Sequence, residues 1–328
     1  MKPAGRDLLS SRGRAGVFGA LILLACGRFS PAGEAAPAAD PAPSSASVPA
    51  LPLVALKSIG PVPAALRGSL PLAPFYQKCL LLGDFPVLSS GVVRDEALAE
   101  AAWIVSGMLA KRPDILKEMA RRQGRLVVMG TAERTVDVPE HSDLKPADYW
   151  NRRARGLGAS ADCPVVSCAE ENLLCSPGDP YSTENILVHE FAHAIHELGL
   201  QKLDPAFDGK LKAAYREALA KGLWKNTYAA ENKGEYWAEI SQSWFNTNRQ
   251  NDSLHNHVDT RAELEAYDPT AAALCRSTYG DNPWTYVRPD QPGRLGKDHL
   301  ASLDRATLVP FRWDEGKKQE KAGGSAKR

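Results

Sequence analysis

The chain has 328 residues, a formal net charge of +1, and 24% charged residues. This nearly neutral balance argues against a dedicated nucleic-acid-binding surface. The length is sufficient for one domain with a sizeable core between less regular terminal segments.

The first 26 residues are predicted to be an export signal. Three arginines precede the apolar stretch 15–25, which is short for a bilayer span but has the length of a signal-peptide core. Residues 23–26, Leu-Leu-Ala-Cys, also resemble a bacterial lipobox, in which Cys26 is lipidated. An ordinary signal peptide and a retained membrane anchor are the alternatives. We therefore expect an exported chain, either a bacterial cell-envelope lipoprotein that contacts the membrane through a lipid at Cys26, or a secreted protein.

Two further segments look unlike a folded domain. Residues 27–69 are rich in Pro, Ala and Ser, especially over 30–53, which predicts a linker. Residues 314–328 are rich in Lys, Gly and Ser and predict a disordered basic tail. The folded domain is thus predicted to span 70–313.

The first half of this domain indicates helices and a small sheet. Residues 95–110 carry apolar side chains at helical spacing, and Pro113 can begin a second helix. Residues 125–129 and 134–138 look like adjacent strands. The pattern predicts an α+β fold.

The most informative motif is His189-Glu190-Phe191-Ala192-His193. Residues i and i+4 lie on one face of a helix, so both imidazoles can bind one metal ion while Glu190 reaches a water molecule on it. Ser182 and Thr183 can cap this helix, and Gly199 can end it. The motif predicts a zinc site with Glu190 as general base.

Most of this helix is apolar, with Leu187, Phe191, Ala194 and Leu198 in one row. The remaining strip holds Ile186, His189, Glu190, His193, His196 and Glu197, and it predicts the side that faces the metal. His196 is interpreted as a residue that either supports the ligands from behind or lies at the rim of the site, and it is not counted as a ligand.

A third ligand is needed. The metzincin pattern requires Gly at position 196 and His at 199, whereas this chain has His196 and Gly199, so that class is excluded. A glutamate on a later helix is the other common solution. Glu235 and Glu239 both qualify: they share one helix face, and either could bind the metal while the other orients a ligand imidazole.

Tyr228, six residues, and Glu235-Tyr236-Trp237-Ala238-Glu239 resemble the pattern of the anthrax lethal factor-like gluzincin peptidases. The resemblance covers about residues 182–245. It implies that Glu235 is the third zinc ligand, that Glu239 supports a ligand histidine, and that Tyr228 hydrogen-bonds the oxyanion. His196 departs from the family, which tends to have an acidic residue there.

The resemblance also implies a zincin-like α+β domain, with an active-site helix on a small mixed sheet and a mainly helical C-terminal part. The expected function is an exported endopeptidase with one Zn²⁺ per chain, whose partner is a peptide or protein substrate. A non-catalytic zincin-like binding protein and a zinc amidase acting on cell-wall peptides are the alternatives.

In such peptidases a substrate commonly adds as a strand to the edge of the sheet. Residues 136–141 and 155–160 are the candidates for that edge. A further helix is predicted to open at Asp204-Pro205, which places Tyr228 on the connection to the Glu235 helix. His255, His257 and His299 lack ligand spacing and are interpreted as surface or structural residues.

The cysteines and a basic cluster complete the pattern. Cys79, Cys163, Cys168, Cys175 and Cys275 remain besides Cys26. In an exported chain they predict disulfides, with one thiol left over and 163–168 able to close a short loop. A cysteine-bound structural zinc ion is a weaker alternative, because the spacing matches no standard knuckle.

Arg152, Arg153 and Arg155 are interpreted as a solvated face rather than a site for acidic substrates.

Overall fold

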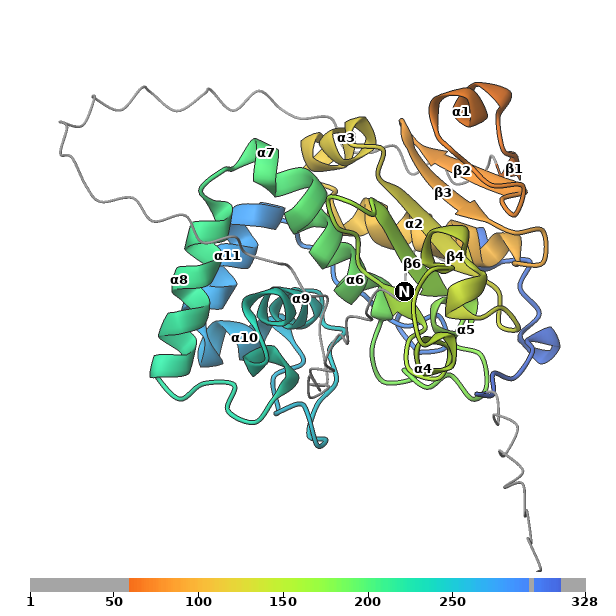
Figure 1. Cartoon of the computed structure of the whole chain (residues 1–328). Helices are drawn as coiled ribbons and strands as arrows, with labels where there is room; N and C mark the ends of the chain where they lie inside the picture. Colours follow the sequence, from red (N-terminus) through yellow and green to blue (C-terminus); the bar gives the residue numbers. More distant parts are fainter. Residues whose placement is uncertain (1–58, 295–297, 314–328) are drawn as a thin grey trace, which may run out of the picture. The chain divides into compact units, whose positions relative to one another are not determined.

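The computed structural model describes residues 59–294 and 298–313, which form a mixed sheet with surrounding helices (Figure 1). The α+β class predicted from the sequence is confirmed. The expected signal segment 1–26 and basic tail 314–328 lie outside the described residues. Among the residues that are described, no helix has both the length and the apolar character needed to cross a membrane.

The sheet has six strands in the order β1-β2-β3-β4-β6-β5. The pairs β1–β2, β2–β3 and β5–β6 are antiparallel, whereas β3, β4 and β6 run parallel. The helices α2 and α3 form the crossover that the parallel pair β3–β4 requires. The strands are β1 Gly60–Pro61, β2 Lys78–Leu82, β3 Phe85–Ser89, β4 Arg125–Met129, β5 Gly156–Leu157 and β6 Val165–Ala169.

The centre of the sheet is buried on both faces. On β4, Leu126 and Val128 belong to the main hydrophobic core, while Val127 and Met129 belong to a smaller cluster. This explains the continuous apolar run of the predicted strand 125–129, because a strand covered on both faces needs no polar alternation. Arg125 is buried in the same strand and pairs with Glu140 at 2.8 Å.

The first group of helices follows the prediction closely. Nearly all of α2 is buried, and Pro113 is the first residue of α3. However, β1 and α1 precede residue 70, so the folded domain begins earlier than predicted, with Gly60 paired to Cys79. The bounds are α1 Ala64–Ser69, α2 Asp95–Met108, α3 Pro113–Arg121, α4 Ala147–Asn151 and α5 Glu170–Leu173.

The strand predicted at 134–138 is wrong. Two short 3-10 helices, Thr135–Asp137 and Pro139–His141, occupy this region. The Asp137 carboxylate accepts a hydrogen bond from the Arg134 backbone N–H at 2.8 Å, a local bond that competes with strand pairing. Pro139 also lacks the N–H that a ladder would use.

The later helices form a second group, and α6 lies between that group and the sheet (Figure 1). The α-helices are α6 Ile186–Ala194, α7 Gln201–Leu203, α8 Phe207–Ala220, α9 Lys233–Trp244, α10 Arg261–Tyr267 and α11 Pro269–Tyr279. A π-helix at Ile195–Leu200 joins α6 to α7, and short 3-10 turns cover Tyr228–Ala230, Asp298–Leu300 and Arg305–Thr307.

Both predicted ends of α6 require correction. Asn185 caps the helix, with its side chain accepting a bond from Val188 N–H at 3.1 Å, so Ser182 and Thr183 are not the caps. The helical path also continues past Gly199 to Leu203. A Cβ at Gly199 would lie 2.7 Å from Ile115 Cγ2. Glycine is therefore needed there for close packing against α3 rather than for ending a helix. The helix that was predicted to open at Asp204-Pro205 is α8, and it begins slightly later, at Phe207.

The five cysteines of the described region are all free thiols, contrary to the predicted disulfides. Four of them are buried, and Cys163 is partly buried. The loop proposed between Cys163 and Cys168 is not closed in the structure, because Cys168 packs in the main hydrophobic core while Cys163 packs against the smaller cluster.

Candidate metal centre

Three side chains converge where α6 meets the first turn of α9. His189 and His193 lie one turn apart on α6, and Glu235 faces them from α9. Glu235 Oε2 lies 3.1 Å from His189 Nε2 and 3.5 Å from His193 Nε2. One donor atom from each residue lies within 4.8 Å of the others, so this group can hold a metal ion.

The packing of α9 on α6 produces this convergence. Trp237 is fully buried, and its indole N–H donates to the Ala192 carbonyl of α6 at 2.8 Å. Asn232 caps α9 by accepting bonds from the N–H groups of Gly234 and Glu235 at 2.8 and 3.0 Å. The cap fixes the first turn, and that turn carries Glu235 toward the histidines.

The electrostatics of this group favour a cation. Burial lowers the pKa of His189, but the hydrogen bond to Glu235 and the charges of Glu190, Glu235 and Glu239 outweigh it and raise that pKa well above its usual value. Burial raises the pKa of Glu235, yet hydrogen bonds to His189 and His193 outweigh this and lower it. The buried Glu235 carboxylate is thus stabilised by positive charge on the imidazoles beside it. A divalent metal ion would supply that charge, and two imidazoles with one carboxylate are a donor set suited to it.

Glu190 lies beside the two histidines, partly shielded from solvent. Burial raises its pKa; the two histidines act in the opposite direction, and Glu235 and Glu184 add to the rise. A Cβ on Gly158 would lie 3.2 Å from Glu190 Oε2 and 2.8 Å from His193 Cβ. The absence of a side chain at Gly158 therefore lets the segment after β5 approach the turn of α6 that carries Glu190 and His193.

Tyr228 borders the same group from the 3-10 turn ahead of α9. Its ring stacks on His189, with centroids 6.1 Å apart and planes inclined by 25°. Burial and the charges of Glu235 and Glu190 raise the pKa of its hydroxyl, with Arg153 opposing them. Tyr228 is therefore held close to the candidate ligands as a protonated phenol.

Two side chains face the outer nitrogen of His189. Gln242 Oε1 lies 2.8 Å from Nδ1, and Glu239 Oε1 lies 3.6 Å from it. Gln242 in turn donates its amide N–H to Glu184 Oε2 at 3.0 Å, which directs its carbonyl oxygen at the imidazole. A proton on Nδ1 then leaves the Nε2 lone pair for a metal ion.

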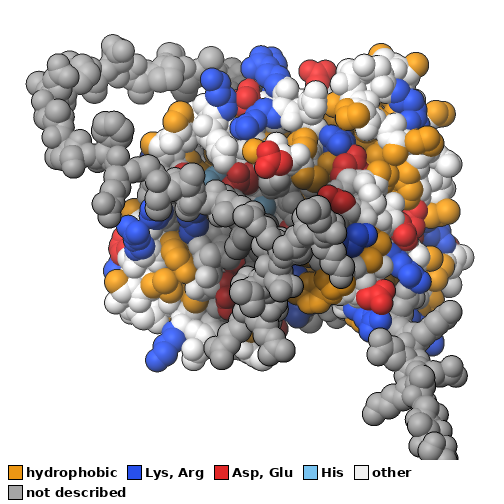
Figure 2. Space-filling model, in the orientation of Figure 1, with side chains coloured by type: hydrophobic (Ala, Val, Ile, Leu, Met, Phe, Trp, Pro, Cys, Tyr) orange, Lys and Arg blue, Asp and Glu red, His pale blue; other side chains and the backbone are white. Residues whose placement is uncertain are grey.

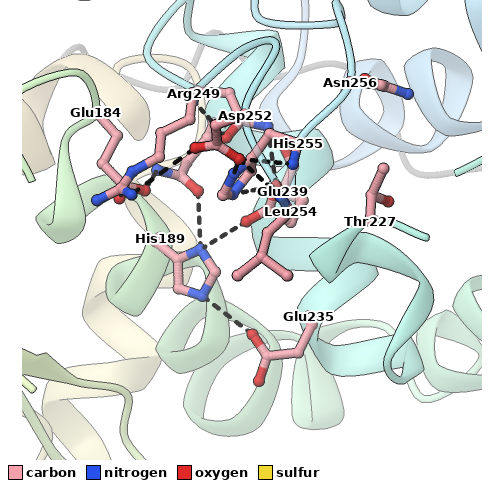
Figure 3. Close-up of polar contacts among 12 residues, drawn as sticks. Glu184, His189, Thr227, Glu235, Glu239, Arg249, Asp252, Leu254, His255 and Asn256 are labelled. Atoms are coloured by element: carbon pink, nitrogen blue, oxygen red, sulfur yellow. Dashed lines mark hydrogen bonds and ion pairs between the residues drawn. The ribbon is translucent and has the colours of Figure 1, made fainter. Parts of the chain in front are cut away.

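The structure therefore places all six predicted site residues together and adds Gln242. Figure 3 shows His189 between Glu235 on one side and Glu239 on the other. Gln242 lies seven residues after Glu235 and three after Glu239, a spacing that puts all three on one face of α9. This spacing from Glu235 and Glu239 was the signal in the sequence from which Gln242 could have been found.

The remaining histidines lie outside the ligand group. Burial lowers the pKa of His196 to about 4, and its Nε2 lies 3.3 Å from Asp208. His299 contacts Glu100 at 2.7 Å, and His257 is exposed. His255 is different, because its Nε2 lies 3.6 Å from Glu239 Oε2. No spacing rule indicated that contact.

The predicted basic cluster is only partly exposed to solvent. Figure 2 shows histidine and acidic side chains close together on one surface of the molecule. In the predicted basic cluster, Arg152 is exposed, but Arg155 is buried and pairs with Glu171 at 2.5 Å. The interpretation of Arg155 as solvated is therefore wrong.

No protein-family model matches this chain, and no curated protein matches it significantly.

Proposed function

We propose that this chain is a zinc-dependent peptidase of the gluzincin type that hydrolyses peptide bonds. The observation that carries the proposal is the convergence of His189, His193 and Glu235 with Glu190 beside them. The proposal includes the zincin-like fold, the lethal factor-like family, and export of the chain.

The donor set favours zinc over other divalent ions. Two imidazole nitrogens and one carboxylate oxygen leave a fourth position open, the arrangement of catalytic zinc sites. Magnesium and calcium instead prefer sets made of oxygen atoms. When bound, zinc supplies Lewis acidity, lowering the pKa of a water molecule and polarising a carbonyl group.

Glu190 is the general base in this proposal. Its carboxylate accepts a proton from the water that attacks the carbonyl carbon, and then passes it to the amine that leaves. The burial that raises its pKa makes the carboxylate a stronger base than an exposed glutamate. No covalent intermediate with a serine or cysteine is required.

Tyr228 is the residue that hydrogen-bonds the oxyanion. Its hydroxyl keeps its proton because burial and nearby carboxylates raise its pKa. A donor aimed at the oxygen that gains charge stabilises the transition state more than the substrate.

The edge of the sheet supports a peptide as the substrate. The strand β5, inside the predicted candidate 155–160, ends the strand order of the described sheet and is followed by Gly158 against His193. An extended peptide pairing with this edge would bring its backbone carbonyl groups near the metal-binding turn. The other candidate, 136–141, forms 3-10 helices and offers no strand edge.

The test combines metal analysis with peptide cleavage. The full chain should bind about one zinc ion and cleave members of a diverse peptide library. Glu190→Gln keeps the size of the side chain and should retain zinc while losing about 10²–10⁴-fold in kcat. Glu197→Gln, on the same helical path but outside the ligand group, is the matched control and should stay active. Zinc binding without cleavage by the wild type would overturn the peptidase and favour a binding protein.

A further inference from the structure

A closed circuit of polar contacts runs behind His189 (Figure 3). One arm goes from His189 through Gln242 to Glu184, which forms an ion pair with Arg249. The other arm goes from His189 to Glu239 and then to His255. Each of the two carboxylates behind the imidazole is therefore paired with a basic side chain.

Both basic side chains come from one loop, residues 248–255, which we call the bracket loop. Asp252 joins them, with Oδ1 2.8 Å from His255 Nδ1 and Oδ2 3.9 Å from Arg249. The same Asp252 Oδ1 accepts the backbone N–H groups of Leu254 and His255 at 2.8 and 2.9 Å. Asp252 thus fixes both the shape of the loop and the direction of His255.

The bracket loop also holds Tyr228. The Leu254 carbonyl accepts the Tyr228 backbone N–H at 2.7 Å. Adjacent residues, Leu254 and His255, therefore contact the oxyanion residue and the carboxylate behind a ligand histidine. The loop connects two parts of the site that come from different elements.

His255 lies between two carboxylates, Asp252 and Glu239. The side chain of Glu239 is only 3% exposed and that of His255 only 8% exposed. A buried carboxylate is costly unless it is paired and hydrogen-bonded. Asn248 donates to the same Glu239 oxygen at 3.1 Å, but it is neutral. Of these two partners of that oxygen, His255 is the one that can carry positive charge.

We propose that His255 is a positioning residue of the metal centre, which holds Glu239 toward His189 and so strengthens metal binding. This rests on the proposed zinc site but not on peptidase activity. The role predicts that removing His255 costs metal affinity only while Glu239 is present.

The test is a double-mutant cycle on the full chain, with zinc affinity measured by chelator competition. His255→Ala should weaken zinc binding about tenfold, at the low end of the range for residues outside the ligands, and Glu239→Ala should weaken it about 10–100-fold. Adding His255→Ala to Glu239→Ala should change affinity less than about twofold, because coupled residues are not additive. His255→Gln, whose amide can still donate to Glu239, should recover part of the loss.

His257→Ala is the matched control, since His257 is exposed and two residues away. It should bind zinc like the wild type. Wild-type affinity in His255→Ala, or an equal loss with and without Glu239, would overturn the role of His255. If His255→Ala does not fold without metal, His255→Leu, which fills the space but cannot donate to Glu239, replaces it in the cycle under the same criteria. Absence of zinc from the wild type would instead overturn the metal centre itself.

Discussion

His189 and His196 lie on one continuous helical path, and both are buried beside carboxylates, yet their electrostatic settings are opposite. His189 faces Glu235 and Glu239, whose side chains are 12% and 3% exposed, and its pKa is raised. His196 faces Asp208, whose side chain is 50% exposed, and its pKa is lowered to about 4.

The difference lies in how each carboxylate is neutralised. Asp208 forms an ion pair with Lys233, so burial dominates at His196 and favours the neutral imidazole. Around His189 the carboxylates are buried, and together they outweigh the desolvation of the imidazole. A buried histidine beside a carboxylate is therefore not enough to form a candidate metal centre. The carboxylates around it must also be buried, so that they require positive charge from the site itself.

The largest expected difference between the His189 turn and the His196 turn is in zinc affinity after each imidazole is removed. His189→Ala should weaken zinc binding by about 10²–10⁴-fold, because a structural zinc site worth about 10–16 kcal/mol, shared over three protein ligands, gives about 3–5 kcal/mol for each. His196→Ala should leave zinc affinity within about twofold, given a neutral side chain outside the ligand group. Chelator competition on both variants measures this. Equal losses of zinc affinity in His189→Ala and His196→Ala would contradict the proposed difference between these two histidines.

The next largest effect is expected at Tyr228, which stacks on His189. Tyr228→Phe should lower kcat by about 10²–10³-fold, the cost of one oxyanion donor, with zinc affinity unchanged. Tyr215→Phe is the control, since the Tyr215 hydroxyl donates to the Ala230 carbonyl at 2.7 Å, outside the ligand group. A parallel fall in zinc affinity would show that Tyr228 acts on the metal site rather than on the oxyanion.

A pH effect is expected from His196. Between pH 6.5 and about 4 the unfolded chain binds a proton at this residue that the folded chain does not. Stability should therefore fall as pH drops through that window, by about 3 kcal/mol in total for this group. Thermal unfolding of the metal-free chain, compared with His196→Asn, isolates the contribution. An unchanged slope in the variant would contradict a buried neutral His196.

The smallest effect is expected at Asp208. Asp208→Asn removes a carboxylate that is half exposed, and exposed ion pairs contribute about 0–1 kcal/mol. Stability should change by less than about 1 kcal/mol, and zinc affinity should stay at the wild-type value. Urea unfolding and chelator competition test the two parts. A large loss of zinc affinity in Asp208→Asn would mean that the carboxylate beside His196 also supports the candidate metal site around His189.

The elements predicted most accurately from the sequence are those with strong local patterns. The buried helix α2, the start of α3 at Pro113, and β4 all lie where their apolar spacing indicated. The three candidate ligands were also available from the sequence, because helical spacing puts His189 and His193 on one face and the resemblance to the gluzincin pattern favoured Glu235 over Glu239.

The parts that were missed depend on tertiary contacts. Gly199 looked like a helix end, but it serves the packing against Ile115. Arg155 looked solvated, but Glu171 pairs with it in the interior. His255 lies 16 residues after Glu239 with no periodic relation to it, and only the bracket loop brings the two together. Such contacts leave no local spacing to detect.

The most direct test of the metal centre is X-ray absorption spectroscopy of the zinc-loaded full chain, together with its metal content. We predict about one zinc ion per chain, with nitrogen and oxygen ligands at about 2.0–2.2 Å, and loss of this signal in Glu235→Ala. Absence of zinc from the protein purified with excess zinc would contradict the account. So would sulfur ligands at about 2.3 Å, which would place the metal on cysteines instead.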